Sequence, residues 1–226
     1  DGKGFKWDVQ EPAIDETPSA QSPEAAIASR VVAGLTTPIA LDIAALRAEF
    51  STLSAKQFDE AVELGVTMSA RTILGRVDEN AQSGEDIRQR KFAALKRLYD
   101  RQPALTAKTS TSKINQAYST PAPMAYMASV LGQIETGTII AEPSAGNGML
   151  LLDRQPGQTI LANELDPTRR ERLAMQGIEA TGEDATTWTP AQAPDRVIAN
   201  PPFGQIMQEG GGNKVFQTPM GETTSI

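Results

Sequence analysis

Polar side chains stand at the ends of several apolar runs in this chain, and one of these segments has an unusual composition. The hydrophobic run at 196–199 ends in Asn200-Pro201-Pro202-Phe203. Proline fixes φ and has no amide donor, so the two prolines should end a strand and hold the Pro201 carbonyl beside the Asn200 side chain. Two acceptors would then converge at the end of the strand. The other interpretation is an Asn-Pro turn that only ends a strand.

A glycine-rich turn follows an earlier apolar run at 139–141 and leads into an apolar helix start at Met149. The turn reads Glu142-Pro143-Ser144-Ala145-Gly146-Asn147-Gly148. Glycine tolerates the backbone angles of a tight turn, and the amides of such a turn can face the charged or polar tail of a ligand. Taken alone, the segment would favour a plain strand-to-helix loop.

Acidic residues follow two further strand-like segments. They are Glu164-Leu165 after the run at 159–163, and Asp184-Ala185 after the short segment at 177–181. A carboxylate at the tip of the second strand of a doubly wound sheet can accept hydrogen bonds from a ribose diol. A carboxylate after the third strand can accept one from an exocyclic amino group such as that of adenine. Solvated acidic loops are the alternative in both places.

The elements that position these residues alternate between two patterns. Short apolar runs lie at 138–141, 159–163 and 196–199, and stretches with helical spacing lie at 121–133 and 167–176. This alternation is typical of parallel strands joined by crossover helices. We therefore predict an α/β fold with a Rossmann-like sheet over residues 106–226, entered through a polar connection at 106–118.

Two further regions are predicted upstream. Residues 1–25 combine acids with prolines, which indicates an extended acidic arm, and residues 26–105 have the apolar spacing of a small helical region. The expected apolar faces are Phe58, Val62, Val66 and Ile73, and Phe92, Leu95 and Leu98. Ser54 and Ser83 are predicted N-caps, and Pro103 should end the last helix.

A basic cluster lies on the last predicted helix of this region. It comprises Arg88, Arg90, Lys91, Lys96, Arg97 and Arg101. These side chains could contact phosphates. The acids Glu85, Asp86 and Asp100 are interspersed with them, which favours a solvated helix face.

Composition excludes several kinds of chemistry. The 226 residues include no cysteine and no histidine, which removes disulfides, thiolate or imidazole metal ligands, and catalysis by either side chain. The formal net charge of −7 argues against nucleic-acid binding held by bulk electrostatics, so any such contact must be local. No metal site is expected. No apolar run is long enough to span a membrane, and we expect a cytoplasmic protein.

The polar segments together resemble known motifs. The turn at 142–148 resembles the cofactor motif of class I methyltransferases, with Glu142 where an aspartate is commoner. The segment at 200–203 resembles the catalytic motif of N6-adenine DNA methyltransferases and related amino-methyltransferases. Tyr118-Ser119-Thr120-Pro121 resembles the motif that precedes the first strand in these enzymes and covers the methionine end of the cofactor.

The order of these motifs corresponds to the γ arrangement of the family, in which target recognition lies downstream. The amino-acid sequence around 116–125 and 199–204 is also similar to the methyltransferase part of phage and plasmid methyltransferase–helicase proteins related to strawberry notch. The resemblance covers about residues 106–204 and says nothing about the helical region.

This resemblance implies S-adenosylmethionine as cofactor. Gly146, Asn147 and Gly148 would line its methionine moiety, Glu164 would bind its ribose and Asp184 its adenine. The remaining implied contacts are Tyr118, Ser119, Thr120, Pro121, Glu142, Pro143, Ser144, Ala145, Leu165, Ala185 and Asn200.

The same resemblance implies that an adenine N6 amine in DNA is the target. The catalytic residues would be Asn200, Pro201, Pro202 and Phe203. The Asn200 side chain and the Pro201 carbonyl would accept the amine hydrogens, while Phe203 would stack on the extruded base. Amino-methyltransferases of RNA or of protein glutamine use the same turn. A non-catalytic, cofactor-binding or structural module of a larger phage or plasmid antirestriction protein is the alternative of another class.

A complete sheet of this family needs about three strands beyond the catalytic one. After Gly204 the sequence has a polar tail without a further strand–helix unit. We therefore expect a class I methyltransferase sheet that is incomplete after its fourth strand. The remainder of a longer polypeptide, such as a helicase, or a partner chain would complete it, and the isolated 226 residues should be poorly soluble, self-associated or partly folded.

Overall fold

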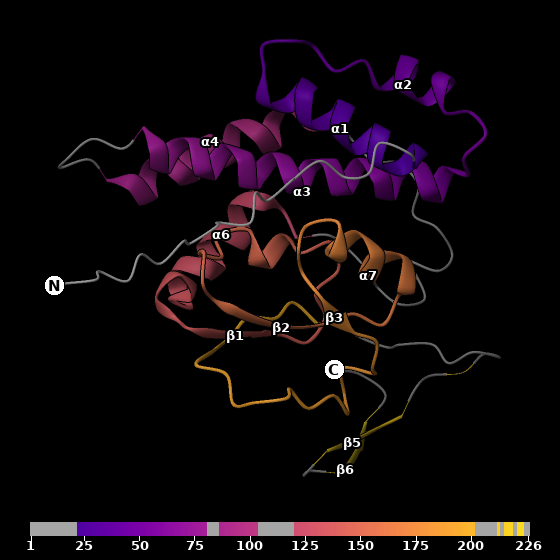
Figure 1. The fold of residues 1–226 in the computed structure, drawn as a ribbon. Coiled ribbons are helices and arrows are strands. Elements are labelled where there is room, and N and C mark those ends of the chain that lie inside the picture. Colours follow the sequence, from indigo (N-terminus) through magenta and orange to yellow (C-terminus); the bar gives the residue numbers. More distant parts are fainter. Residues whose placement is uncertain are drawn as a thin grey trace, which may run out of the picture.

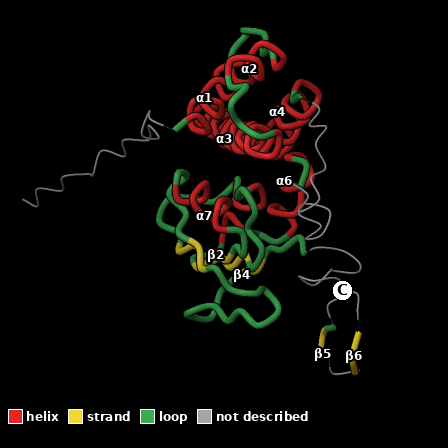
Figure 2. Tube along the Cα trace, turned by 90° about the vertical axis from the view of Figure 1, so that its right-hand side faces the viewer, coloured by secondary structure: helices red, strands yellow, loops and turns green. Residues whose placement is uncertain are grey.

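Residues 22–80, 86–103, 120–201, 212, 215–218 and 221–223 are described by the structure, which is a computed structural model. Within this part of the chain, a layer of helices lies beside a layer formed by a parallel sheet and two further helices (Figure 1). A view turned by 90° shows the same two layers (Figure 2). The predicted α/β class is confirmed, and the order of the strands is compatible with a Rossmann-like fold.

The helical layer is organised around one long helix. Its members in the described chain are α1 (Pro23–Thr36), α2 (Ile43–Glu49), α3 (Ala55–Glu79) and α4 (Ile87–Arg101). Both α1 and α4 pack against α3. None of the described helices combines the length and the apolar character needed to cross a membrane.

The helix ends of this layer follow the predicted signals in part. Ser54 begins α3 with a capping box, in which it exchanges side-chain and backbone hydrogen bonds with Gln57. α4 ends at Arg101, before Pro103, as predicted. The predicted cap Ser83 lies outside the described residues, and Asp86 caps α4 by accepting a hydrogen bond from the Gln89 amide.

The N-terminal boundary of the layer differs from the prediction. Residues 22–25 were assigned to the acidic arm, but they begin α1, whereas residues 1–21 lie outside the described part. The Ser22 side chain accepts a hydrogen bond from the Ala25 amide at 3.1 Å. Pro23 and Glu24 occupy the first turn, where a fixed φ and a negative charge both stabilise a helix. The proline and the acid are thus helix-start residues.

The sheet contains four parallel strands in the order β3-β2-β1-β4. They are β1 (Ile139–Glu142), β2 (Thr159–Asn163), β3 (Ala180–Thr181) and β4 (Arg196–Val197). In register, Ala141 of β1 lies between Leu161 and Val197. β2 has the predicted bounds, while β3 and β4 are shorter than predicted, although the Ile198 amide still donates to the Ala141 carbonyl at 3.0 Å.

β4 forms one edge of the sheet that the described residues build. Within the described residues its strand neighbour is β1, and Val197 is 61% exposed. The described residues contain no fifth strand beside it. A separate antiparallel pair, β5 (Phe216–Thr218) and β6 (Gly221–Thr223), was not predicted, because the polar tail lacks the alternating apolar pattern of a strand.

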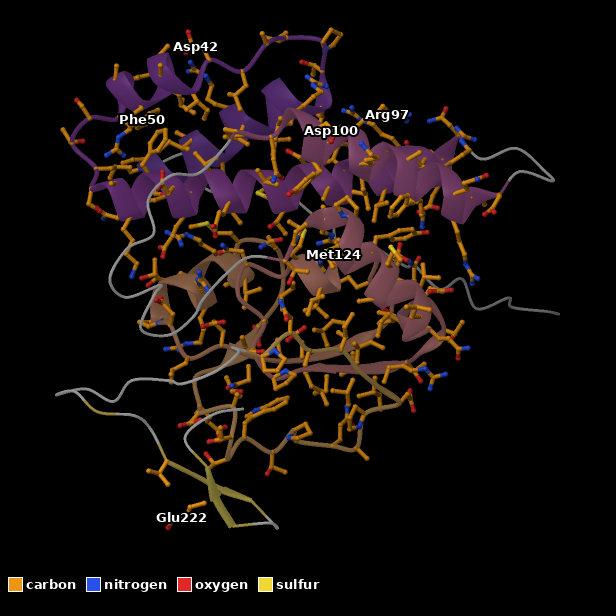
Figure 3. The ribbon with its side chains drawn as sticks, turned by 180° about the vertical axis from the view of Figure 1, so that it is seen from behind. Asp42, Phe50, Arg97, Asp100, Met124 and Glu222 are labelled. Carbon is orange, nitrogen blue, oxygen red and sulfur yellow. The ribbon has the colours of Figure 1, made fainter. Side chains whose placement is uncertain are left out.

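The helices of the sheet layer, α6 (Ala122–Leu131) and α7 (Pro167–Ala174), lie on the face of the sheet that is turned toward the helical layer (Figures 1 and 2). The crossover from β3 to β4, at 182–195, is a loop that runs on the opposite side. The outward side of α6 is apolar in part, since Met124 is 63% exposed (Figure 3).

One continuous apolar core joins the two layers. On α3 the predicted face is confirmed, since Phe58 and Val66 are buried and Ile73 packs against the core. On α4 the prediction is partly wrong, because Phe92 remains 36% exposed while Lys91 is buried beside the apolar residues of that helix.

The basic cluster on α4 is largely engaged within the molecule, which neither earlier interpretation anticipated. Arg88 pairs with Glu135 at 2.7 Å, and the buried Lys91 Nζ lies 3.0 Å from an oxygen of the buried Asp153. Arg101 donates to the carbonyls at the C-terminal end of α1. Binding of phosphates by this cluster would compete with these contacts.

Candidate functional site

The glycine-rich turn connects β1 to a short 3-10 helix, η2 (Met149–Leu151), where the sequence had indicated a helix start. Gly146 and Gly148 have φ angles of +56° and +82°, in the left-handed region that strains other residues. The Gly148 amide donates to the Ala145 carbonyl at 2.8 Å, and the Ala145 amide donates to the Asn163 carbonyl at 2.9 Å. The turn therefore depends on both glycines and on the second strand.

Glu142 ends β1 with a carboxyl group that is fully buried. Its Oε1 accepts from the amide of Ser144 at 3.2 Å and from the Ser144 hydroxyl at 3.5 Å. Its Oε2 has no hydrogen-bond partner among the described residues. Burial raises the pKa of Glu142 to about 8, although the hydrogen bonds from Ser144 oppose this shift. A cationic or hydroxyl donor reaching Oε2 would satisfy this atom.

Glu164 follows β2 and is also buried, at 8% exposure. Its Oε2 accepts from the Gly146 amide at 2.7 Å, and its Oε1 accepts from the Asp166 amide at 2.9 Å. The carboxylate therefore joins the glycine-rich turn to the turn that begins α7. Because a carboxylate has about four acceptor positions, both oxygens keep capacity for further donors, such as a pair of hydroxyls.

Asn163 is a site residue that the sequence analysis missed. Its Nδ2 donates to the carbonyls of Pro143 and Glu183 at 3.0 and 2.9 Å, and its Oδ1 accepts from the Thr181 hydroxyl and the Glu183 amide at 2.8 and 2.9 Å. This buried amide ties together the ends of β1, β2 and β3. The available signal was an asparagine at the end of an apolar run, but the prediction selected the adjoining Glu164 instead.

The predicted residues after β2 and β3 lie on the exposed side of the site. Asp184 is partly buried, and its Oδ1 accepts from the amide and the hydroxyl of Thr186 at 3.0 and 2.7 Å, which stabilises its own turn. Leu165 is 59% exposed, and Ala185 is exposed as well. These residues are therefore more exposed than the buried carboxyl groups of Glu142 and Glu164.

Asn200 and Thr120 are brought together although they are far apart in the sequence. The Asn200 Nδ2 donates to the Thr120 hydroxyl at 2.9 Å. With the amide nitrogen engaged in this way, Oδ1 is the atom that can accept hydrogens from an amine. Pro121 caps the N-terminal end of α6, and Pro201 is exposed. The predicted residues Tyr118, Ser119, Pro202 and Phe203 lie outside the described residues.

Asn147, between the two glycines, is held from the other side. It is 4% exposed, its Nδ2 donates to Glu63 Oε2 of α3 at 3.2 Å, and its carbonyl accepts from the Gln176 side chain at 2.9 Å. Nothing in the sequence indicated that the helical region reaches this turn, because the contact joins residues 63 and 147 of different layers.

The site thus combines a left-handed glycine turn, two buried carboxyl groups and a positioned amide at the carboxyl ends of the strands. Such an arrangement can hold a ligand that carries cationic and hydroxyl groups beside a planar amine. No protein-family model matches the chain, and no curated protein or solved structure matches it either. The functional assignment therefore depends on the chain's own residues.

Proposed function

We propose that this chain is the cofactor-binding and catalytic part of an S-adenosylmethionine-dependent methyltransferase that acts on the N6 amine of adenine in DNA. The observation that carries the proposal is the hydrogen bond between Asn200 and Thr120. It joins the two segments that resemble the catalytic motif and the cofactor-covering motif. The Asn200 segment follows β4, which pairs in parallel with β1, and β1 ends at Glu142.

The residues at the turn fit the proposed cofactor. The buried Glu142 has an acceptor oxygen without a partner in the described structure, and it would hold the cofactor's ammonium group. Glu164 would accept from the ribose hydroxyls, and the amides around Gly146 and Gly148 would line the methionine chain. S-adenosylmethionine supplies an electrophilic methyl group when it is bound. Two acids beside one turn favour a cationic ligand of this kind.

The target amine would be held by acceptors alone. The lone pair of an aromatic amine is delocalised into its ring, and acceptors on both hydrogens favour the more tetrahedral, nucleophilic form. Asn200 Oδ1 and the Pro201 carbonyl would provide these acceptors. Positioning and electrostatics would then supply most of the catalysis, in keeping with a chain that has no histidine or cysteine base.

Two other functions share part of this support. Amino-methylation of RNA or of protein glutamine needs the same pair of acceptors. We prefer DNA adenine as the target because of the sequence resemblance at 116–125. A non-catalytic module would keep the cofactor turn without transferring a methyl group. Engagement of the basic cluster within the molecule gives no support to nucleic-acid binding by α4, so a DNA contact would have to come from elsewhere.

Transfer of a radiolabelled methyl group to DNA, RNA and a glutamine-containing protein tests these functions side by side. We expect transfer to DNA adenine by the wild type and loss of transfer in Asn200→Ala, with cofactor affinity nearly unchanged in a calorimetric titration. Asn80→Ala, at the exposed end of α3, is the control. Wild-type turnover by Asn200→Ala would refute the catalytic assignment, and cofactor binding without transfer to any acceptor would favour the module.

A further inference from the structure

Three charged side chains of α3 contact the glycine turn or the segment of α7 that follows Glu164. They are Lys56, Glu60 and Glu63, which recur at the spacing of one helix face. Lys56 Nζ lies 3.9 Å from the Asp166 carboxylate, which caps α7. The other two contacts are shorter and reach deeper, so the helical layer is connected to both segments through polar groups.

The Glu60 contact anchors α7. Glu60 Oε2 lies 2.7 Å from the Arg172 guanidinium, whose side chain is 2% exposed, while that of Glu60 is 12% exposed. A pair removed from water in this way is sensitive to the loss of either member. Because α7 begins at Pro167, shortly after Glu164, this pair fixes the helix that follows one carboxylate of the site.

The Glu63 contact holds the glycine turn itself. Asn147 is buried between the two left-handed glycines, with Glu63 on its side chain and Gln176 on its carbonyl. Its Oδ1 has no partner among the described residues, so the bond from Nδ2 to Glu63 is what orients the amide. If this acceptor were lost, a buried donor would be unsatisfied and the turn would relax.

We propose that α3 is a positioning element for the glycine turn and that Glu63, acting through Asn147, keeps this turn in its ligand-binding form. The ligand named in the test rests on the proposed function, whereas the positioning of the turn does not. Coupling between two sites is reciprocal, so cofactor binding would also tighten the docking of α3 on the sheet layer. This gives the helical region a role in cofactor binding.

The first test measures amide exchange in the cofactor-free protein. Glu63→Ala should accelerate exchange of the hydrogen-bonded Gly146 and Gly148 amides by about tenfold, while the core of α1 keeps its protection. Glu63→Gln retains an acceptor oxygen and should restore most of the protection. Glu79→Ala, an exposed glutamate on the same helix, is the matched control. Unchanged exchange at both glycines in Glu63→Ala would overturn the proposal.

The second test measures cofactor affinity by calorimetry. Glu63→Ala should bind S-adenosylmethionine about tenfold more weakly, Glu63→Gln should lie near the wild type, and Glu79→Ala should match it. A cycle with Asn147→Ala separates the contact from any general loss of stability, since the two substitutions should be non-additive. Full additivity would refute the coupling.

The two proposals fail in different ways. A wild-type chain that does not bind S-adenosylmethionine, with Glu63→Ala still accelerating exchange at the turn, would refute the proposed function and support the positioning role. A wild-type chain that binds and transfers, with Glu63→Ala unaltered in exchange and affinity, would refute the positioning role alone.

Discussion

Replacing Glu142 by glutamine should make the cofactor-free protein more stable at neutral and alkaline pH. The carboxyl group is fully buried, and burial raises its pKa from 4.5 to about 8. Between these values the unfolded chain releases the proton and the folded chain keeps it. The unfolded state is therefore favoured as the pH rises, and stability that is fully present below about pH 4.5 is lost progressively up to about pH 8.

The size of the effect follows from the two pKa values. Each pH unit inside this window changes the free energy of unfolding by up to about 1.4 kcal/mol. The unfolded carboxyl group is not yet fully ionised at pH 5, so the loss of stability between pH 5 and pH 7 is slightly below the maximum for two pH units, at about 2.5 kcal/mol. Glutamine keeps an oxygen that can accept from Ser144, and it has no proton to release in this range.

Urea denaturation at several pH values measures this difference. We expect the stability difference between Glu142→Gln and the wild type to grow by about 2.5 kcal/mol from pH 5 to pH 7. Glu49→Gln, at a half-exposed glutamate on α2, is the control for the substitution itself. Parallel pH profiles for the wild type and Glu142→Gln would show that Glu142 ionises normally in the folded chain, and the reasoning from its burial would be wrong.

Two further substitutions test other parts of the structure. Gly146→Val should abolish measurable cofactor binding, because a β-branched residue is strained at φ +56°. The strain comes from the backbone angle alone, since the nearest atom to an added Cβ belongs to Arg169, at 3.9 Å. Wild-type affinity in a titration would contradict this prediction. Lys91→Met should lower the free energy of unfolding by about 3–5 kcal/mol, since Asp153 would remain as a buried, unpaired acid. The double variant Lys91→Met, Asp153→Leu should recover much of this loss in urea denaturation, and equal loss in both variants would refute the explanation.

Regular local signals were enough to predict most elements of this fold. The apolar run at 159–163 became β2 with the expected bounds, and Ser54 and Pro103 mark helix ends as their chemistry requires. Phe92 shows the limit of periodicity, because helical spacing cannot determine which of two adjoining residues turns inward. The buried position next to it is taken by Lys91, whose partner Asp153 is contributed by the other layer.

The geometry of the candidate site was predictable where it depends on adjoining residues and unpredictable where it depends on distant ones. The glycine turn and its two carboxyl groups could be read from strand ends, and so could Asn200. The contact of Asn200 with Thr120 and that of Asn147 with Glu63 join segments whose approach is determined by packing of whole layers. Asn163 was missed for a different reason, since its hydrogen bonds join three strand ends that meet only in the folded sheet.

The polar groups around the glycine turn differ in how well they are satisfied, and the difference has a functional consequence. Glu164 receives amides on both oxygens, and Asn163 has partners for its nitrogen and its oxygen, so both rigidify the strand ends without a ligand. Glu142 instead keeps one buried oxygen without a partner in the described structure. A buried acceptor left in this state lowers stability, and a ligand that donates to it would remove this cost. The same carboxyl group would therefore destabilise the free protein as it ionises and strengthen the binding of a cation that supplies the missing partner.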